Sequence, residues 1–449
     1  MIGADVNMLS GSVFKGLLRI SIPIMIMNVL QSLISVIDMT ILGYMVNDDA
    51  VGSVGASSTL ITFITTLLIG ISVGSNVIVA KYIGKNDMEG SQKAVGTSVL
   101  FSLVGGTFLL VLGLAFANPL LRLMNCPETL FEDATLYFRL YFLGVPFLML
   151  YNFCASILRA TGDSKRPMYI LTAGGILKIV LNFVLLYVTD MTVEAVGIST
   201  IVSSVFSGSL CFLALVKHDG FIKFKLKHFK FYIEQFKGIL FIGVPAGLQS
   251  GLYSLANVVI AVAVNGFGPA ATKGISIANN FDNVLYQIAV APSLAAMPYI
   301  SQNVSHGNAS RAQNSFYKAI LITVMLGASF GALSAIFSRQ LSSLISKDPL
   351  VIKYSMQKMV IISSTYFIAG INEIFCAGLR GLGRSILPTI ATFVFLFLLR
   401  FFWVYVLFPL VPNFTFLYLV WPVGWTLSIF TLFIPLFKSF NKAKQKTLN

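Results

Sequence analysis

Charged residues are scarce in this chain of 449 residues, where they make up 11% of the sequence against 56% for hydrophobic residues. That composition excludes an ordinary soluble domain and indicates a protein that crosses a membrane many times. The sequence also lacks a G-x-x-x-x-G-K-[ST] phosphate-binding loop, so we expect no ATP hydrolysis at such a site within these residues. Any work the protein does would then draw on an ion gradient or on the gradient of its own substrate.

Residues that usually perform catalysis or bind metals are also few. The three histidines all fall in predicted loops, at His218, His228 and His306. The four cysteines have no metal-like spacing and stand at Cys126, Cys154, Cys211 and Cys376. An H-E-x-x-H motif is absent. We therefore expect no metal site, no cofactor and no enzymatic activity.

Long apolar stretches fill most of the chain. A membrane-spanning helix needs about 20 apolar residues to cross a hydrocarbon core of about 30 Å. Twelve stretches meet this requirement, at about 17–43, 53–80, 94–117, 135–158, 167–188, 194–216, 238–264, 274–301, 315–337, 355–379, 386–408 and 416–437. The expected fold class is an all-α membrane protein with twelve transmembrane helices.

The net charge of +14 is spread over short loops between the apolar stretches. Basic residues recur in alternate loops, for example at Lys85, Arg166 and throughout 217–237, whereas acids collect in the other loops. This pattern is typical of cytoplasmic loops that orient a membrane protein, and it does not indicate a nucleic-acid partner. We expect a multi-pass protein of the cell membrane, monomeric, with both termini in the cytoplasm.

The chain contains an internal repeat of about half its length. FKGLLRISIP at 14–23 matches FKGILFIGVP at 236–245 with an offset of 222, and ILRATGDSKRP at 157–167 matches GLRGLGRSILP at 378–388 with an offset of 221. Because six helices per repeat is an even number, the repeats have the same orientation. The sequence thus predicts two six-helix lobes related by a pseudo-two-fold axis along the membrane normal, at 1–216 and 238–449, joined by a basic connector at 217–237.

A carboxylate, Asp38, lies well inside the first apolar stretch. At helical spacing it continues a polar stripe made by Asn28, Gln31 and Ser35. Lipid offers such a stripe no hydrogen-bond partner, so we expect it to face protein or water, with Asn28, Gln31 and Ser35 lining the substrate cavity. An intramembrane acid usually marks an ion or substrate path, although a polar seam between helices with Asp38 paired to a neighbour is the alternative. Pro23 is a predicted bend in this helix.

Other ionisable residues are predicted at membrane depth: Lys178, Asp282, Glu373 and Arg400. Asp282 lies in a helix polar over much of its circumference, so we expect a wet cavity lined by Asn280, Asp282, Asn283 and Gln287. Glu373 is expected at the substrate cavity, as a gate or ion-pair residue, or it is an interfacial charge. Lys178 either lies against Asp38 or snorkels or forms a structural pair. Arg400 either has a role at depth or likewise snorkels or forms a structural pair. Burial favours a neutral carboxylic acid whereas a nearby ammonium favours a carboxylate, and these opposing effects leave the state of Asp38 open.

The second repeat keeps the polar face of the first helix and loses its acid. With the offset of 222, Gln31 and Ser35 correspond to Tyr253 and Asn257, while Asp38 corresponds to Ile260. We therefore expect Tyr253 and Asn257 to line the substrate cavity and the first lobe alone to hold the titratable group of the first helix.

Several motifs together resemble the multidrug and toxic compound extrusion (MATE) family of secondary transporters, within a wider flippase superfamily. They are P-x14-D-x4-G at Pro23, Asp38 and Gly43, KYIGKND at 81–87, ILRATGD at 157–163, LKIVLN at 177–182 and GLRGLG at 378–383. The resemblance implies outward export of organic, often cationic compounds in exchange for H+ or Na+. It also implies that Asp38 is the coupling acid and that Pro23 is the bend in the first helix.

Departures from the family pattern bear on the coupling ion. Where family members resemble N-x3-D in the fifth helix, this chain has Lys178 and Asn182. Acids that the sodium-driven branch has in helices seven and ten correspond to Tyr253 and Ala369. Because Na+ prefers hard oxygen ligands, we expect protons as the coupling ion, handled by Asp38, Lys178 and Asn182.

The sequence thus predicts a secondary exporter of small organic, cationic or zwitterionic compounds, coupled to H+ and less plausibly to Na+. Export would proceed by alternating access, in which the two lobes rock within the lipid bilayer. The alternative is a flippase for lipids or lipid-linked precursors, which would need basic side chains for phosphate.

Overall fold

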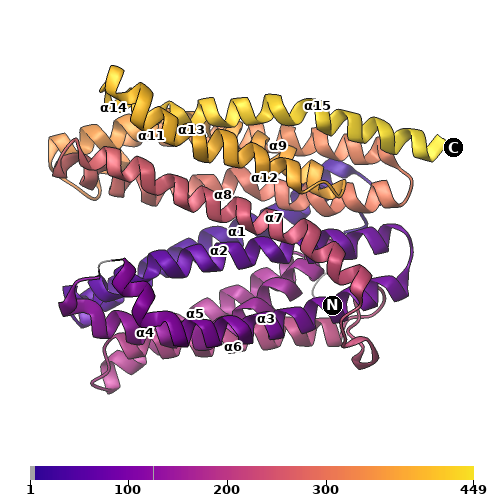
Figure 1. The fold of residues 1–449 in the computed structure, drawn as a ribbon, viewed down its shortest axis with the longest axis horizontal. Helices are drawn as coiled ribbons and strands as arrows, with labels where there is room; N and C mark the ends of the chain where they lie inside the picture. The colour runs from indigo at the N-terminus through magenta and orange to yellow at the C-terminus, as the bar shows by residue number, and fades with distance from the viewer. Residues whose placement is uncertain (1–5, 125, 449) are drawn as a thin grey trace. The chain divides into compact units, whose positions relative to one another are not determined.

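A computed structural model describes residues 6–124 and 126–448, and these are built almost wholly of long helices (Figure 1). Within these ranges twelve helical segments are long and apolar enough to cross a membrane, which confirms the number expected from the sequence. A membrane-crossing chain must satisfy its backbone hydrogen bonds internally, and helices achieve this within each segment. The protein is therefore an all-α, multi-pass membrane protein.

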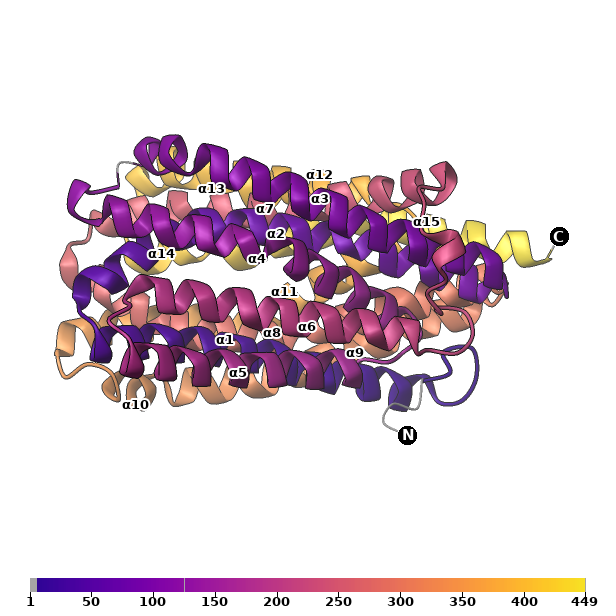
Figure 2. The ribbon, with the colours of Figure 1, turned by 90° about the horizontal axis from the view of Figure 1, so that it is seen from below.

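One compact unit comprises Val29–Gly243. Its helices are part of α1 (Val13–Met45), α2 (Asp48–Gly84), α3 (Met88–Leu123), α4 (Glu128–Ala160), α5 (Lys165–Val188), α6 (Val193–Val216), the short η1 (Leu226–His228) and the start of α7 (Ile233–Asn265). The central helix is α4, which packs against α2, α3 and α6, while α5 runs beside α6 (Figure 2). Phe138, Phe142 and Phe153 of α4 form the middle of the apolar core.

The second compact unit comprises Val6–Asn28 and residues 244–448. Its further helices are α8 (Pro269–Ser305), α9 (Ala309–Ile336), α10 (Ser338–Ser343), α11 (Pro349–Gly381), α12 (Ile386–Thr392), α13 (Leu399–Phe402), α14 (Phe414–Tyr418) and α15 (Val420–Leu448). The central helix here is α11, which packs against α8, α9 and α15. Tyr366, Tyr418 and Trp425 give this core a strongly aromatic character.

The internal repeat is visible in the helix boundaries. Helices α2 and α8 begin 221 residues apart and end 221 residues apart, and the same holds for α4 and α11. Equivalent helices also meet through equivalent glycines. A Cβ atom on Gly106 of α3 would lie 2.5 Å from Cα of Pro146, and one on Gly327 of α9 would lie 2.9 Å from Cα of Phe367. Close backbone approach at small residues is how membrane helices associate in lipid.

This contact predicts the outcome of a substitution. Gly327→Val forces a side chain against the backbone of α11, and overpacking costs about 1–3 kcal/mol. We expect the apparent melting temperature of the purified protein in detergent to fall by roughly 3–10 °C. As a control, a Cβ on Gly55 would meet nothing within 4 Å, so Gly55→Ala should leave the melting temperature unchanged or raise it slightly. Equal melting temperatures for both variants would contradict the close contact.

The eleventh span departs from the uninterrupted helix that the sequence suggests. It consists of α12, a π-helical segment η2 (Phe393–Leu398), α13, a second π-helical segment η3 (Trp403–Leu407) and a 3₁₀ turn η4 (Phe408–Leu410). A π turn accommodates one extra residue within a helix and is often found at functional sites. The repeat offset is 221 where α5 and α12 begin, at Lys165 and Ile386. If η2 accommodates one extra residue, the offset becomes 222 at α13.

Helices α1 and α7 each contribute to both units. In α1 the division falls between Asn28 and Val29, and in α7 between Gly243 and Val244. The chain that leads into α1 is fastened within the second unit, because the carbonyl oxygen of Met8 accepts hydrogen bonds from Asn303 Nδ2 and Arg311 Nε, both at 3.0 Å. The first helix of each repeat is thus shared between the two units.

Candidate functional site: buried ion pairs in each unit

The predicted coupling residues of the first unit lie together. Asp38 of α1 is buried, and its Oδ2 lies 2.5 Å from Nζ of Lys178 on α5. Asn182, one turn further along α5 and fully buried, donates from Nδ2 to Asp38 Oδ1 at 2.7 Å. The side chains at i and i+4 of α5 therefore hold both oxygens of one carboxylate.

The two ends of this cluster differ in their surroundings. The side chain of Asp38 is 8% exposed, whereas that of Lys178 is 18% exposed, so the ammonium is the more accessible partner. Within the described part of the chain, Oδ1 of Asn182 is buried and accepts no hydrogen bond. A half-turn of this amide about its terminal torsion would place that oxygen against Asp38, where it would accept a hydrogen bond from a protonated acid. The cluster thus offers a partner to either protonation state.

The remainder of the polar stripe on α1 has two different environments. Asn28 donates from Nδ2 to Oε1 of Gln287 on α8 at 3.1 Å, within the second unit. Gln31 and Ser35 are exposed, and the Ser35 hydroxyl donates to the Gln31 carbonyl oxygen at 3.1 Å. Pro23 is buried within α1, whose helix continues on either side of it.

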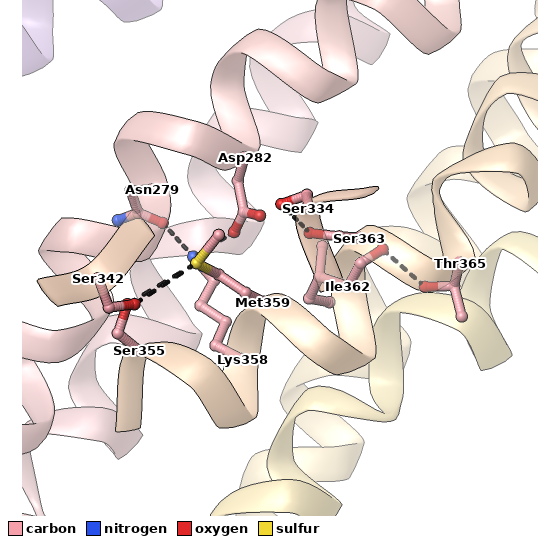
Figure 3. Close-up of polar contacts among 10 residues, drawn as sticks. All are labelled: Asn279, Asp282, Ser334, Ser342, Ser355, Lys358, Met359, Ile362, Ser363 and Thr365. Carbon is pink, nitrogen blue, oxygen red and sulfur yellow. Dashed lines mark hydrogen bonds and ion pairs between the residues drawn. The ribbon is translucent and has the colours of Figure 1, made fainter. Parts of the chain in front are cut away.

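The second unit contains a buried ion pair of its own (Figure 3). Asp282 of α8 and Lys358 of α11 are each 5% exposed, and Nζ of the lysine lies 2.9 Å from Oδ2 of the acid. The same Nζ donates to Oδ1 of Asn279, one turn before Asp282. Nearby on α10 and α11, the Ser342 hydroxyl donates to Ser355 Oγ at 2.8 Å. The acid that the sequence suggests as a cavity residue is here paired with a lysine from a neighbouring helix.

Lys358 is a membrane-depth residue that the sequence did not indicate. It falls three residues after the expected start of the tenth span, where a lysine is typical of a helix end. The structure begins α11 at Pro349, so Lys358 lies more than two turns inside the helix. The Asp348 carboxylate caps this start by accepting from the Leu350 N–H at 2.8 Å, and the D-P dipeptide at 348–349 is the signal that would have placed it.

The other expected cavity residues are dispersed. Asn280 and Asn283 are exposed on α8. Glu373 is half-buried on α11, two turns before Arg380, which donates to Oε1 of Gln249 on α7. Tyr253 and Asn257 of α7 both contact Arg400: Asn257 Oδ1 accepts from Nη1 at 2.6 Å, and the guanidinium carbon lies 5.6 Å from the Tyr253 ring centroid. The structure thus joins these two α7 residues to a cation, and among the described residues it gives Asn280 and Asn283 no such partner.

A duplicated bundle of membrane-crossing helices, with ionisable side chains buried in each unit, is the architecture of a membrane transporter. The MatE family pattern matches the chain twice, at residues 23–184 and 245–406. These matches cover most of the chain and coincide with the two repeats. The chain belongs to the MatE family, which confirms the resemblance seen in its motifs and places it among transporters rather than enzymes.

Individual proteins give a consistent result. The probable multidrug resistance protein YoeA of Bacillus subtilis is 27% identical over 84% of this chain and 83% of its own length. The FAD transporter of Shewanella oneidensis is 25% identical over 84% of each chain. A crystal structure of MATE in the straight conformation superposes with a TM-score of 0.91 over 98% of this chain and 99% of that chain, at 21% identity. This last likeness concerns the fold.

Proposed function

We propose that this protein exports small organic compounds in exchange for protons, and that Asp38 is the group that takes up and releases the proton. The observation that carries this proposal is the contact of Asp38 with Lys178 and Asn182, at 2.5 and 2.7 Å. Buried carboxylates in membrane helices typically serve ion pathways. A proton that reaches Asp38 breaks the ion pair without requiring a large movement of the helices.

The charge of the cluster changes with the proton. With Asp38 ionised, the carboxylate and the Lys178 ammonium sum to zero, and a cationic or zwitterionic compound meets no net repulsion there. With Asp38 protonated, the cluster carries one positive charge, and the ammonium loses its partner. Because like charges in a weakly screened interior repel strongly, protonation would favour release of a cationic group and deprotonation would favour its binding. This opposition is what exchange of a proton for a substrate requires.

The donors around Asp38 favour a proton over Na+ as the coupling ion. Na+ binding needs several oxygen ligands directed at one point, whereas an ammonium and an amide N–H occupy the two oxygens of Asp38. A metal ion would have to displace both donors. A proton needs only one lone pair of the carboxylate.

The relatives support organic cargo of more than one kind. One is named for multidrug resistance and another for FAD, which carries phosphates. For this chain we propose cationic or zwitterionic organic compounds as cargo and the cell membrane as its location. The basic loops favour a cytoplasmic location for both termini, and the proposed functional form is a monomer.

Proteoliposomes test the coupling ion. We expect uptake of a fluorescent organic cation into inside-out-oriented vesicles to follow an imposed pH gradient and to be unaffected by an imposed Na+ gradient at constant pH. The experiment needs a nigericin control, which collapses the pH gradient and should stop transport. Transport driven by the Na+ gradient alone would contradict proton coupling.

A further inference from the structure

A buried arginine in the second unit has partners that differ from those of Lys178 and Lys358. Arg400 lies on α13, between the two π-helical segments, and is 1% exposed. It does not snorkel toward the membrane surface. A charge at this depth costs several kcal/mol unless it is paired, so its partners need an explanation.

Those partners are neutral. Nη1 donates to Asn257 Oδ1 at 2.6 Å, and the guanidinium carbon lies 4.7 Å from the Trp421 ring centroid and 5.6 Å from that of Tyr253. Trp425 fixes the tyrosine by donating from Nε1 to its hydroxyl at 2.5 Å. Among the described residues, no carboxylate forms an ion pair with Arg400, and its Nη2 is buried without a hydrogen-bond partner.

The repeat explains how this uncompensated charge arises. With the offset of 222 that applies beyond η2, Arg400 is the counterpart of Lys178. Both cations reach back to the first helix of their own repeat, one to Asp38 and the other to Asn257. The counterpart of Asp38 is Ile260, so the acid that neutralises the first cation is missing for the second. The first cation thus belongs to a neutral pair, and the second remains a net positive charge.

We propose that Arg400 binds the anionic group of a substrate, a carboxylate or a phosphate carried on an aromatic or other planar framework. The free Nη2 and the fork geometry of a guanidinium suit a bidentate contact with either group. The guanidinium lies over the Trp421 ring, and Tyr418 also stacks on that ring at 5.1 Å, so the planar part would contact the half-buried edges of Trp421 and Tyr253. Exposed Asn257 is the side chain whose change of rotamer would give access. The inference rests on the proposed export function and, within the cargo proposed there, favours zwitterions whose anionic group is carried on a planar framework.

Equilibrium binding to the purified full-length protein in phosphatidylcholine nanodiscs tests this site without any gradient. The probes are 2-naphthoate, 2-naphthyl phosphate and the neutral 2-naphthamide, followed by quenching of tryptophan fluorescence. Because a charge-assisted hydrogen bond contributes about 1.5–3 kcal/mol, we expect both anions to bind roughly 10- to 150-fold more tightly than the amide. Affinity for the anions no greater than for the amide would overturn the proposal.

Variants assign the effect to the site. Arg400→Gln should remove the preference for anions. Arg400→Lys keeps the buried positive charge and serves as the second variant in case Arg400→Gln does not fold. It should lose most of the preference for anions, because an ammonium lacks the fork geometry of a guanidinium. Trp421→Ala should weaken all three probes. Lys273→Gln removes an exposed lysine of α8 and should change nothing. Retention of full anion preference in Arg400→Lys, with Lys273→Gln equal to wild type, would contradict the assignment.

Two further experiments distinguish the Arg400 site from the proton-coupling group and from a lipid-binding site. The first is transport under an imposed pH gradient: loss of transport with the anion preference intact would be a failure of proton coupling alone, and loss of the preference with transport intact would be a failure of the anion site alone. Nanodiscs with 30 mol% phosphatidylglycerol, roughly a third of the lipid, test a lipid headgroup as the occupant. Displacement of the naphthyl probes by this lipid at equal ionic strength would overturn the assignment to a soluble substrate.

Discussion

Asp38→Asn is expected to reduce proton-driven export to the level of protein-free liposomes. Asparagine has no proton to exchange at this position, and it leaves the Lys178 ammonium without its carboxylate, as a fixed positive charge in both halves of the cycle. The ammonium would be affected directly, because its Nζ lies 2.5 Å from Asp38 Oδ2. The measurement is transport into proteoliposomes under an imposed pH gradient, with equal reconstitution checked by protein content.

A matched control lies half a turn away. Thr40 is exposed on α1, and its hydroxyl donates to the Val36 carbonyl oxygen of its own helix at 2.8 Å. Thr40→Val should therefore transport as wild type does. Gradient-driven export retained in Asp38→Asn would show that Asp38 is not part of the coupling mechanism.

Removal of one partner of the second ion pair is expected to have the largest effect on stability. In Lys358→Met the Asp282 carboxylate remains buried without its ammonium, and breaking a buried pair in this way costs about 3–5 kcal/mol. For a unit of this size we expect the apparent melting temperature in detergent to fall on the order of 10 °C. Thermal unfolding followed by a thiol-reactive dye or by tryptophan fluorescence measures it.

The double variant Lys358→Met/Asp282→Asn tests whether the stability lost in Lys358→Met comes from the unpaired Asp282 carboxylate. Once both charges are gone, the desolvation cost of the carboxylate disappears, so most of the lost stability should return. An exposed lysine of the same helix, Lys353, provides the control, and Lys353→Met should stay close to wild type. A double variant less stable than Lys358→Met would mean that the charges do not act as a pair.

Much of the fold could be predicted because the signals that define it are long. Twelve apolar stretches and two repeated sequence blocks fix the number of helices and the duplication, and neither depends on side-chain detail. The exact ends of helices are weaker signals. The start of α11 lies at Pro349, six residues before the predicted 355, because the Asp348 cap and the following proline extend the helix outside the apolar stretch.

The candidate site likewise contains residues that the sequence indicates and contacts that it does not. Asp38 is prominent because an acid at membrane depth is costly, and the resemblance to the family's N-x3-D pattern indicates Lys178 and Asn182. The pairings within the second unit could not be predicted, since nothing in the sequence says which of its helix faces meet. The contact of Asn28 with Gln287 and that of Asp282 with Lys358 are of this kind.

Arg400 shows a further limit. Its equivalence to Lys178 depends on the one residue that the π-helical segment η2 accommodates, and a straight 3.6-residue helix would place the two cations out of register. The sequence alone leaves snorkelling and a structural pair as the ordinary interpretations of Arg400. The structure instead places Arg400 against Asn257 and two aromatic rings.

Cleavage of the chain between the two repeats would not separate the two units, because α1 and α7 each contribute to both. A cut between α6 and α7, at 217–232, yields two fragments. The N-terminal fragment still carries Val6–Asn28, which belongs to the second unit, and the C-terminal fragment still carries the start of α7, which belongs to the first. Each fragment therefore contains a segment that belongs to the compact unit formed mainly by the other fragment, as in a reciprocal domain swap. Co-expressed halves should consequently purify together through a tag on either one, and neither half should be a self-sufficient folding unit.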